Sequence, residues 1–396
     1  MPLHGTPELQ PLSPYALKGM LADGEELAIV DVREELIFSQ GHLLFARSIP
    51  LSRIELNFGR LVPRRATRIV LCDGADGLAR RAADVLAGCG YRNLFALAGG
   101  VAAWADAGLE LFSGVNVPSK AFGELVEHAS ATPSISTDEL ERLMRDGKDL
   151  VVLDSRPFDE YRRISIPTAI NVPGAELVLR ACDIAPSAET LIVVNCAGRT
   201  RSIIGSQSLI NAGVPNKVVA LRNGTMGWQL AGFTCESRQD RRAEEVSAGA
   251  LDWAKSAAGT VASRFGVERI DMATYKQWEQ DRERTLYLFD VRDPEEYRAG
   301  HVPGAISAPG GQLVQATDEY VGTLGARAGR RIEAPRPRRF AGDARRWPGA
   351  RSPGCTRGAD FLSRASAVGA LRAAQPAGVV GRTPRPAPGH SDRAVR

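Results

Sequence analysis

One cysteine lies in a setting that can make a thiol nucleophilic. In the segment VVNCAGRTRSIIGSQSL an apolar run ends at Asn195, Cys196 follows, and a helical pattern begins near Arg201. Backbone N–H groups of a short loop and of a helix N-terminus favour negative charge. Such a setting lowers the pKa of a thiol, so the sequence predicts that Cys196 is a thiolate and a nucleophile. A buried, inert cysteine at a strand end is the alternative.

The residues after Cys196 are expected to complete an anion-binding loop. Arg199 and Arg201 add fixed positive charge, and we expect both guanidinium groups to converge on the sulfur. Gly198 should let the backbone bend tightly without a penalty for a Cβ atom. The same loop would hold an anionic group of a substrate. The predicted binding residues are Ala197, Gly198, Arg199, Thr200, Arg201 and Ser202.

The loop belongs to a repeated pattern. Three segments, starting at residues 29, 152 and 288, share an Asp, an Arg two residues later, an aromatic residue seven later and a Pro nineteen later. The anchoring residues are Asp31, Asp154 and Asp290. Cys72 lies 41 residues after its Asp and Cys196 lies 42 after its own, and a Trp follows each cysteine by 32 residues. We therefore treat Cys72 as the counterpart of Cys196 and expect two complete repeats and a third that stops half-way.

The elements between these residues predict an α/β fold. Short β-branched runs alternate with stretches of helical period that end on Gly. This alternation predicts tandem domains, each a mainly parallel sheet with helices on both faces. Ligands of such sheets bind beyond the carboxyl ends of the strands, where Cys72 and Cys196 both lie.

The composition divides the chain further. The predicted parts are repeat one (1–112), a linker with a short helix around 121–128 (113–134), repeat two (135–238), an Ala-rich helical linker (239–268), repeat three (269–326) and a tail (327–396). The tail contains 16 Arg, no Lys and four acidic residues, a net charge of +12, so the rest of the chain carries −8. We predict that the tail is disordered.

The abrupt change at the tail suggests a shifted reading frame of a GC-rich gene. Ala, Arg, Pro and Gly, which dominate it, have GC-rich codons. Translating the other two frames of the DNA tests this hypothesis, and a genuine basic tail is the alternative. Repeat three has Arg331 and Ile332 at the position of the cysteine, so we expect it to be inactive and not independently folded.

The D-x-R segments, the C-x-G-x-x-R-S loop and the closing Gly-Gly or Asn-Gly…Trp resemble rhodanese-type sulfurtransferase domains. The resemblance covers residues ~10–112, ~135–238 and ~269–326. It implies that the Cys196 thiolate takes the outer sulfur of thiosulfate, releases sulfite and carries a persulfide. A thiophilic acceptor, such as cyanide, a thiol or a protein, would then remove the sulfur. No cofactor is implied.

Three alternatives stay open at this point. The related dual-specificity phosphatases place Arg six residues after Cys, but Ser202 stands there and Arg201 is one residue early, so the loop suits sulfur better. A non-catalytic rhodanese array could act as a sulfur carrier or a protein-docking module. Mercaptopyruvate is an anionic donor, as thiosulfate is.

Repeat one differs at its loop. Asp73 and Asp76 lie beside Cys72, and we expect these charges to raise the pKa of its thiol and to repel an anionic donor. Cys72 is therefore the weaker candidate, in a domain that is inactive or weak. The Asp–Arg pairs of the three repeats are expected to tie strand ends to loops, with Arg156 bordering the Cys196 pocket.

Other residues have structural explanations. Trp104 and Trp228 should be core or pocket-wall residues, and Cys89 and Cys182 should pack. His42 and His301 are replaced by Ser165 in repeat two, so neither is a general base. Cys235 could resolve a persulfide or form a disulfide with Cys196.

Composition excludes several classes. No secretory signal, membrane-length apolar run, zinc spacing or nucleotide motif is present, and six cysteines are too few for a disulfide framework. Because the part of the chain before the tail is acidic, we expect no nucleic-acid partner. We expect no membrane partner, no metal and a cytoplasmic location.

Overall fold

A computed structural model describes residues 9–329 of the chain. The predicted disorder of the tail, its frameshift origin, and Arg331 and Ile332 lie outside the described residues. The predicted tail begins three residues too early, because Arg327–Gly329 forms a strand that pairs with Leu286–Asp290. The sequence pattern is weak there because Arg, Ala and Gly carry little strand preference.

Repeat one forms a five-stranded parallel sheet of order β1-β5-β4-β2-β3. Its elements are β1 (Gln10–Leu12), α1 (Pro14–Ala22), β2 (Leu27–Asp31), α2 (Glu35–Gln40), β3 (Ala46–Ser48), the 3-10 helix η1 (Leu51–Arg53), α3 (Ile54–Leu61), β4 (Arg68–Cys72), α4 (Leu78–Gly88), β5 (Leu94–Leu97) and α5 (Gly100–Asp106).

Repeat two builds the same sheet in the order β6-β10-β9-β7-β8. Its elements are β6 (Ser134–Ile135), α7 (Thr137–Arg145), β7 (Leu150–Asp154), α8 (Phe158–Arg163), β8 (Ile170–Asn171), α9 (Leu177–Ile184), β9 (Leu191–Asn195), α10 (Thr200–Ala212), β10 (Val218–Leu221) and α11 (Gly224–Leu230). The predicted α/β fold with parallel sheets is confirmed.

Helices cover both faces of each sheet because successive side chains of a strand point to opposite faces. In β2, Ala28 and Val30 pack in one core with α3 and α4, whereas Leu27 and Ile29 pack in another with α1, α2 and α5. All five β2 residues are buried, which explains why the first four form a continuous apolar run.

Repeat three is half a domain. It forms α13 (Met272–Gln280), β11 (Leu286–Asp290), α14 (Pro294–Ala299), β12 (Ile306–Ser307), α15 (Gly310–Gln315), α16 (Thr317–Tyr320) and β13 (Arg327–Gly329). Its sheet has the order β12-β11-β13, so β13 stands where β4 stands in repeat one.

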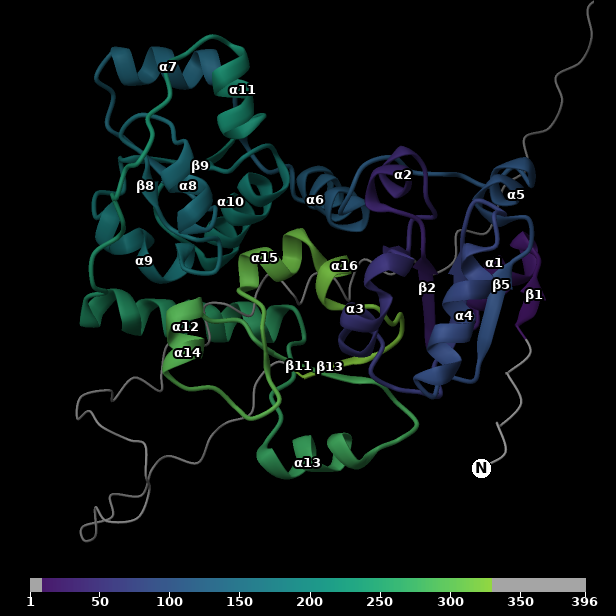
Figure 1. Ribbon diagram of the computed structural model, residues 1–396. Helices are drawn as coiled ribbons and strands as arrows, with labels where there is room; N and C mark the ends of the chain where they lie inside the picture. The colour runs from purple at the N-terminus through teal and green to yellow at the C-terminus, as the bar shows by residue number, and fades with distance from the viewer. Residues whose placement is uncertain (1–8, 330–396) are drawn as a thin grey trace, which may run out of the picture.

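Both linkers contain a helix. The first forms α6 (Val117–Ser130), longer than the expected 121–128, and α6 packs along α10. The second forms α12 (Ala248–Arg264), whereas 239–247 is not helical. Figure 1 shows α6, α15 and α16 between the two five-stranded sheets.

Repeat three is anchored on repeat one. Both carboxylate oxygens of the buried Glu26 accept bonds from Thr285, from its N–H at 2.6 Å and from its Oγ1 at 2.8 Å. The Tyr287 hydroxyl donates to the carbonyl oxygen of Leu61. The incomplete sheet therefore gains buried polar contacts from another repeat.

Candidate active site

Cys196 lies where the sequence predicts, directly after β9 and before α10. The strand ends at Asn195 as expected, and the helix begins at Thr200, slightly earlier than expected. The cysteine is 2% exposed. Its Sγ accepts a hydrogen bond from the Ser202 hydroxyl over 3.1 Å. No side chain of the described residues caps the N-terminus of α10, so its first amides remain available to an anion.

A glycine outside the loop fixes the backbone of the cysteine. A Cβ atom on Gly224 would lie 2.2 Å from the carbonyl oxygen of Cys196, and its φ of +51° is left-handed. The N–H of Thr225 donates to that same oxygen at 2.8 Å. Gly198, in contrast, has no left-handed φ, and a Cβ there would meet no atom within 4 Å. The expectation that Gly198 provides the tight bend is therefore wrong, and Gly224 has the steric role.

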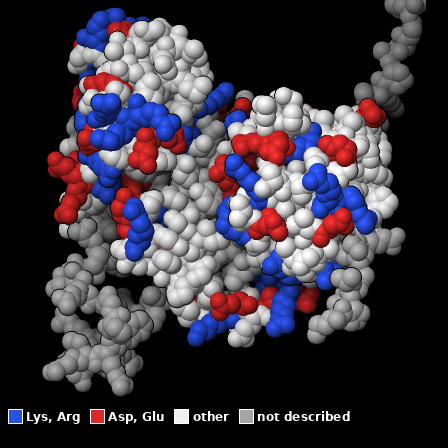
Figure 2. Space-filling model, in the orientation of Figure 1, with Lys and Arg blue, Asp and Glu red and all other residues white. Residues whose placement is uncertain are grey.

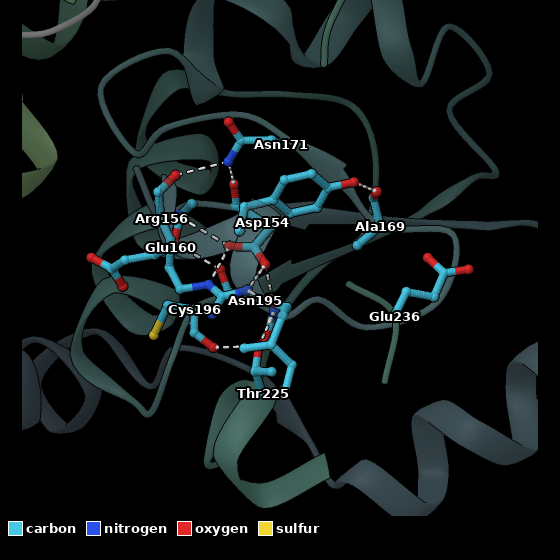
Figure 3. A network of polar contacts seen from close by, with 12 residues as sticks. Asp154, Arg156, Glu160, Ala169, Asn171, Asn195, Cys196, Thr225 and Glu236 are labelled. Carbon is cyan, nitrogen blue, oxygen red and sulfur yellow. Dashed lines mark hydrogen bonds and ion pairs between the residues drawn. The ribbon is translucent and has the colours of Figure 1, made fainter. Parts of the chain in front are cut away.

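A buried polar network supports the loop from behind (Figure 3). Arg156 donates to both oxygens of Asp154, at 2.9 and 2.6 Å, and to the carbonyl of Ile164, so the pair ties the strand end to the following loop. The Asn195 amide donates to Asp154 and to the Thr225 hydroxyl, both at 3.0 Å. The expected tying role of the pair is confirmed.

Arg156 remains charged beside the site. Burial acts to lower the pKa of its guanidinium, but the Asp154 carboxylate outweighs that effect and the pKa is raised, with Glu160 and Cys196 acting in the same direction. Figure 3 places Sγ of Cys196 and the Glu160 carboxylate on the same side of the network.

The two loop arginines do not converge on the sulfur. Arg199 forms an ion pair with Glu127 of α6, and its side chain is half exposed. Arg201 binds both oxygens of Glu160, at 2.9 and 2.8 Å, and Gln312 of α15 at 3.0 Å. The expectation of convergence is wrong because each guanidinium group finds a partner outside the loop. These contacts do not test the anionic state of the sulfur, which stays a prediction.

The strand register corrects the pairing of the two cysteines. Asp31 pairs with Cys72 in the first sheet, whereas Asp154 pairs with Asn195 in the second. Cys72 thus occupies the position of Asn195. The carbonyl of Asp73 accepts the N–H of Val101, as the carbonyl of Cys196 accepts that of Thr225. Asp73, not Cys72, is the counterpart of Cys196, and treating the two cysteines as equivalent is wrong by one residue.

Asp73 fills its own loop. Its carboxylate accepts the N–H of Ala75 and the N–H of Ala79, in the first turn of α4, each at 2.9 Å. Cys72 is fully buried, and burial raises the pKa of its thiol well above the ordinary value, with Asp31 and Asp73 adding to the rise against Arg33. The predicted direction of this pKa shift is right, but burial is its main cause.

The remaining candidates are structural. Trp104 and Trp228 are buried core residues, as expected. Cys89 is exposed and Cys182 only partly buried, so the expectation that Cys89 packs is wrong. The five cysteines of residues 9–329 are free, so the alternative of a disulfide between Cys196 and Cys235 is not realised.

Sequence reasoning missed Glu127, Glu160, Gln312 and Gly224. Glu160 could have been found from the repeats, because Glu stands six residues after the anchoring Asp in repeats two and three, whereas repeat one has Ile37 there. Glu127 and Gln312 lie 72 and 111 residues from their arginines, and no local pattern connects them.

The described part of the chain contains neither a cluster of metal-binding side chains nor a membrane-spanning helix. Within 9–329, no group of three or more His, Cys, Asp and Glu is placed to hold a metal ion. No helix in this part of the chain has both the length and the apolar character needed to cross a membrane. Charges of both signs are mixed on the face shown in Figure 2.

Comparison with known proteins gives consistent matches. A model of the rhodanese-like domain matches residues 13–107, 136–231 and 272–329. The solved structure of thiosulfate sulfurtransferase from Pseudomonas aeruginosa is similar at 47% identity and a TM-score of 0.82, over 91% of this chain and 64% of that chain.

The curated relatives match shorter stretches. The HTH-type transcriptional regulator Rv0324 of Mycobacterium tuberculosis is 32% identical over 26% of this chain and 45% of its own length. The putative sulfur carrier protein YrkF of Bacillus subtilis is 28% identical over 26% of this chain and 54% of its own. The chain thus spans about half the length of these relatives, and less than two thirds of the solved structure.

Proposed function

Because the chain belongs to the rhodanese-like domain family, we propose that it is a thiosulfate sulfurtransferase that carries sulfur as a persulfide on Cys196. The observation that carries this proposal is the position of Sγ, beside the Ser202 hydroxyl at the uncapped start of α10. The substrate follows from the P. aeruginosa enzyme, which is named for thiosulfate.

The reaction divides into two balanced steps. The Cys196 thiolate attacks the outer sulfur of thiosulfate, a sulfur–sulfur bond forms to the enzyme, and the bond within thiosulfate breaks so that sulfite leaves with its electron pair. An acceptor such as cyanide then attacks the terminal sulfur, thiocyanate leaves, and the thiolate is restored. No net redox change occurs in the protein over the cycle.

The residues around Sγ fit the charges of these steps. The thiolate, the persulfide and the donor are all anions, and N–H and O–H donors that are fixed before the reaction stabilise such charge without reorganisation. Ser202 supplies one donor, and the amides of the loop and the first turn of α10 supply others. Arg156 and Arg201 add positive charge at the edge of the site while Asp154 and Glu160 hold them in place.

Mass spectrometry tests the intermediate. After reaction with thiosulfate, the intact chain should gain about 32 Da, one sulfur atom, on Cys196. The Cys196→Ser chain should gain none, and cyanide should remove the mass from the unmodified sequence. A folded chain that gains no sulfur, or gains it on another cysteine, would contradict the proposal.

Sulfur carriage without turnover is the second candidate. It is favoured by the similarity to YrkF, named a putative sulfur carrier, and by the Asp that replaces the nucleophile in repeat one. A persulfide that forms on Cys196 but resists cyanide and small thiols, and passes only to a protein, would favour this candidate. Using mercaptopyruvate in the same assay distinguishes the two donors.

A further inference from the structure

Repeat three reaches the Cys196 loop of repeat two. Gln312 belongs to α15, yet its Oε1 accepts a hydrogen bond from Nη1 of Arg201 at 3.0 Å. The Arg201 side chain is only 7% exposed, whereas that of its partner Glu160 is 37% exposed. The guanidinium group is therefore held by its own repeat through a partly exposed carboxylate and by another repeat through Gln312.

The same helix packs against the edge of repeat two where the sulfur lies. A Cβ atom on Gly311 would lie 3.4 Å from Cα and N of Gly174. The N–H of Gly174 donates to the carbonyl of Ser155 at 3.0 Å, next to Arg156. Thus α15 lies against the loops at the carboxyl ends of β7 and β8, which surround the site together with the Cys196 loop.

Helix α15 is held from the other side as well. Repeat three binds repeat one through Glu26 and Thr285, and Nε of Arg47 donates to the carbonyl of Val321 at 2.7 Å. Helices α15 and α16 also pack on α6, the linker helix whose Glu127 binds Arg199. The position of Gln312 is therefore fixed by contacts with the rest of the chain.

We propose that Gln312 is a positioning residue of the Cys196 site, through which the incomplete third repeat holds Arg201 in the orientation that attracts an anionic sulfur donor. This inference rests on the proposed function of Cys196. Its physical basis is the planar fork of the guanidinium group. Glu160 accepts hydrogen bonds from one edge of the guanidinium group, and Gln312 accepts a bond from another N–H. Because the two partners lie in different directions, they restrict a rotation of the Arg201 side chain that one exposed carboxylate would permit.

Steady-state kinetics of the full chain test the proposal. Gln312→Leu removes the acceptor at similar volume, and Gly311→Val moves α15 away from Gly174 without changing Arg201 or its charge. Each variant should raise KM for thiosulfate about threefold to tenfold and leave kcat within about twofold, because the lost hydrogen bond acts on donor binding only through Arg201. Gln280→Leu, at the exposed end of α13, is the matched control and should not change KM.

Alkylation of Cys196 provides a readout that needs no sulfur transfer. Iodoacetate is an anion and iodoacetamide is neutral, so the ratio of their rates reports the positive charge near the sulfur. The ratio should fall in Gln312→Leu and Gly311→Val and stay constant in Gln280→Leu. An unchanged ratio and KM, or an equal slowing with both reagents, would overturn the inference. If the unmodified chain transfers no sulfur but the ratio still depends on Gln312, the proposed function fails and the positioning role remains.

Discussion

Repeats one and two place different groups at the first position after the central strand of the same sheet. Repeat two has Cys196 there, and the start of α10 has no side-chain cap among the described residues. Repeat one has Asp73, whose carboxylate binds the amides of Ala75 and Ala79. The Asp73 carboxylate thus binds the amides that, in repeat two, would bind an anion from outside the chain. The comparison teaches that the same loop can either leave its amides open to an external anion or bind them with a carboxylate of its own.

Removing each cysteine should give the largest difference between the repeats. Cys196→Ser should lower thiocyanate formation at least about 10³-fold, because the nucleophile is lost. Cys72→Ala should leave turnover within about twofold, because Cys72 lies at a strand end in the position of Asn195. Thermal unfolding of both variants is the control for folding. Equal losses of activity would refute the distinction between the two repeats.

Placing a thiol at the nucleophile position of repeat one should give a smaller effect. In a Cys196→Ser chain, Asp73→Cys should restore sulfur uptake from thiosulfate, but at no more than about a hundredth of the original rate, because no arginine follows it in the loop. Peptide mass spectrometry locates the added sulfur. If the sulfur appears on Cys72, the register described above is wrong.

The pH dependence of alkylation should give the smallest effect, with no consequence for turnover. Burial raises the pKa of the Cys72 thiol, so its reactive thiolate forms only above the range of an ordinary thiol, which titrates near about pH 8.5. Iodoacetamide should therefore modify the exposed Cys89 before the buried Cys72, which should react only at more alkaline pH. Equal rates for the two thiols at neutral pH would contradict the buried position of Cys72.

The sequence predicts most of each repeat but little of what joins the repeats. The anchoring Asp and its Arg, two residues apart, form the same bidentate pair in all three repeats, so a fixed spacing was enough to place the strand ends. The one-residue error at Cys72 had a visible signal. The residue 42 positions after Asp31 is Asp73, and the residue 42 positions after Asp154 is Cys196. Because Cys72 and Cys196 are both cysteines, the sequence pattern aligned them with each other, whereas the strand pairing aligns Asp73 with Cys196.

The partners of the loop arginines could not be predicted in the same way. Charge alone suggested that Arg199 and Arg201 face the sulfur, but a guanidinium group binds whichever carboxylate the tertiary structure brings within reach. Glu127 comes from a linker helix and Gln312 from another repeat. Such contacts depend on how the repeats pack, and periodicity within one repeat contains no information about them.

The bonds between Glu26 and Thr285 affect how such chains can diversify by recombination. Exchanging repeat one for a homologous module that lacks an acid at the position of Glu26 would leave the N–H and the hydroxyl of Thr285 without their acceptors. Repeats one and three are therefore structurally coupled, and a recombinant chain should fold best when both repeats come from the same parent.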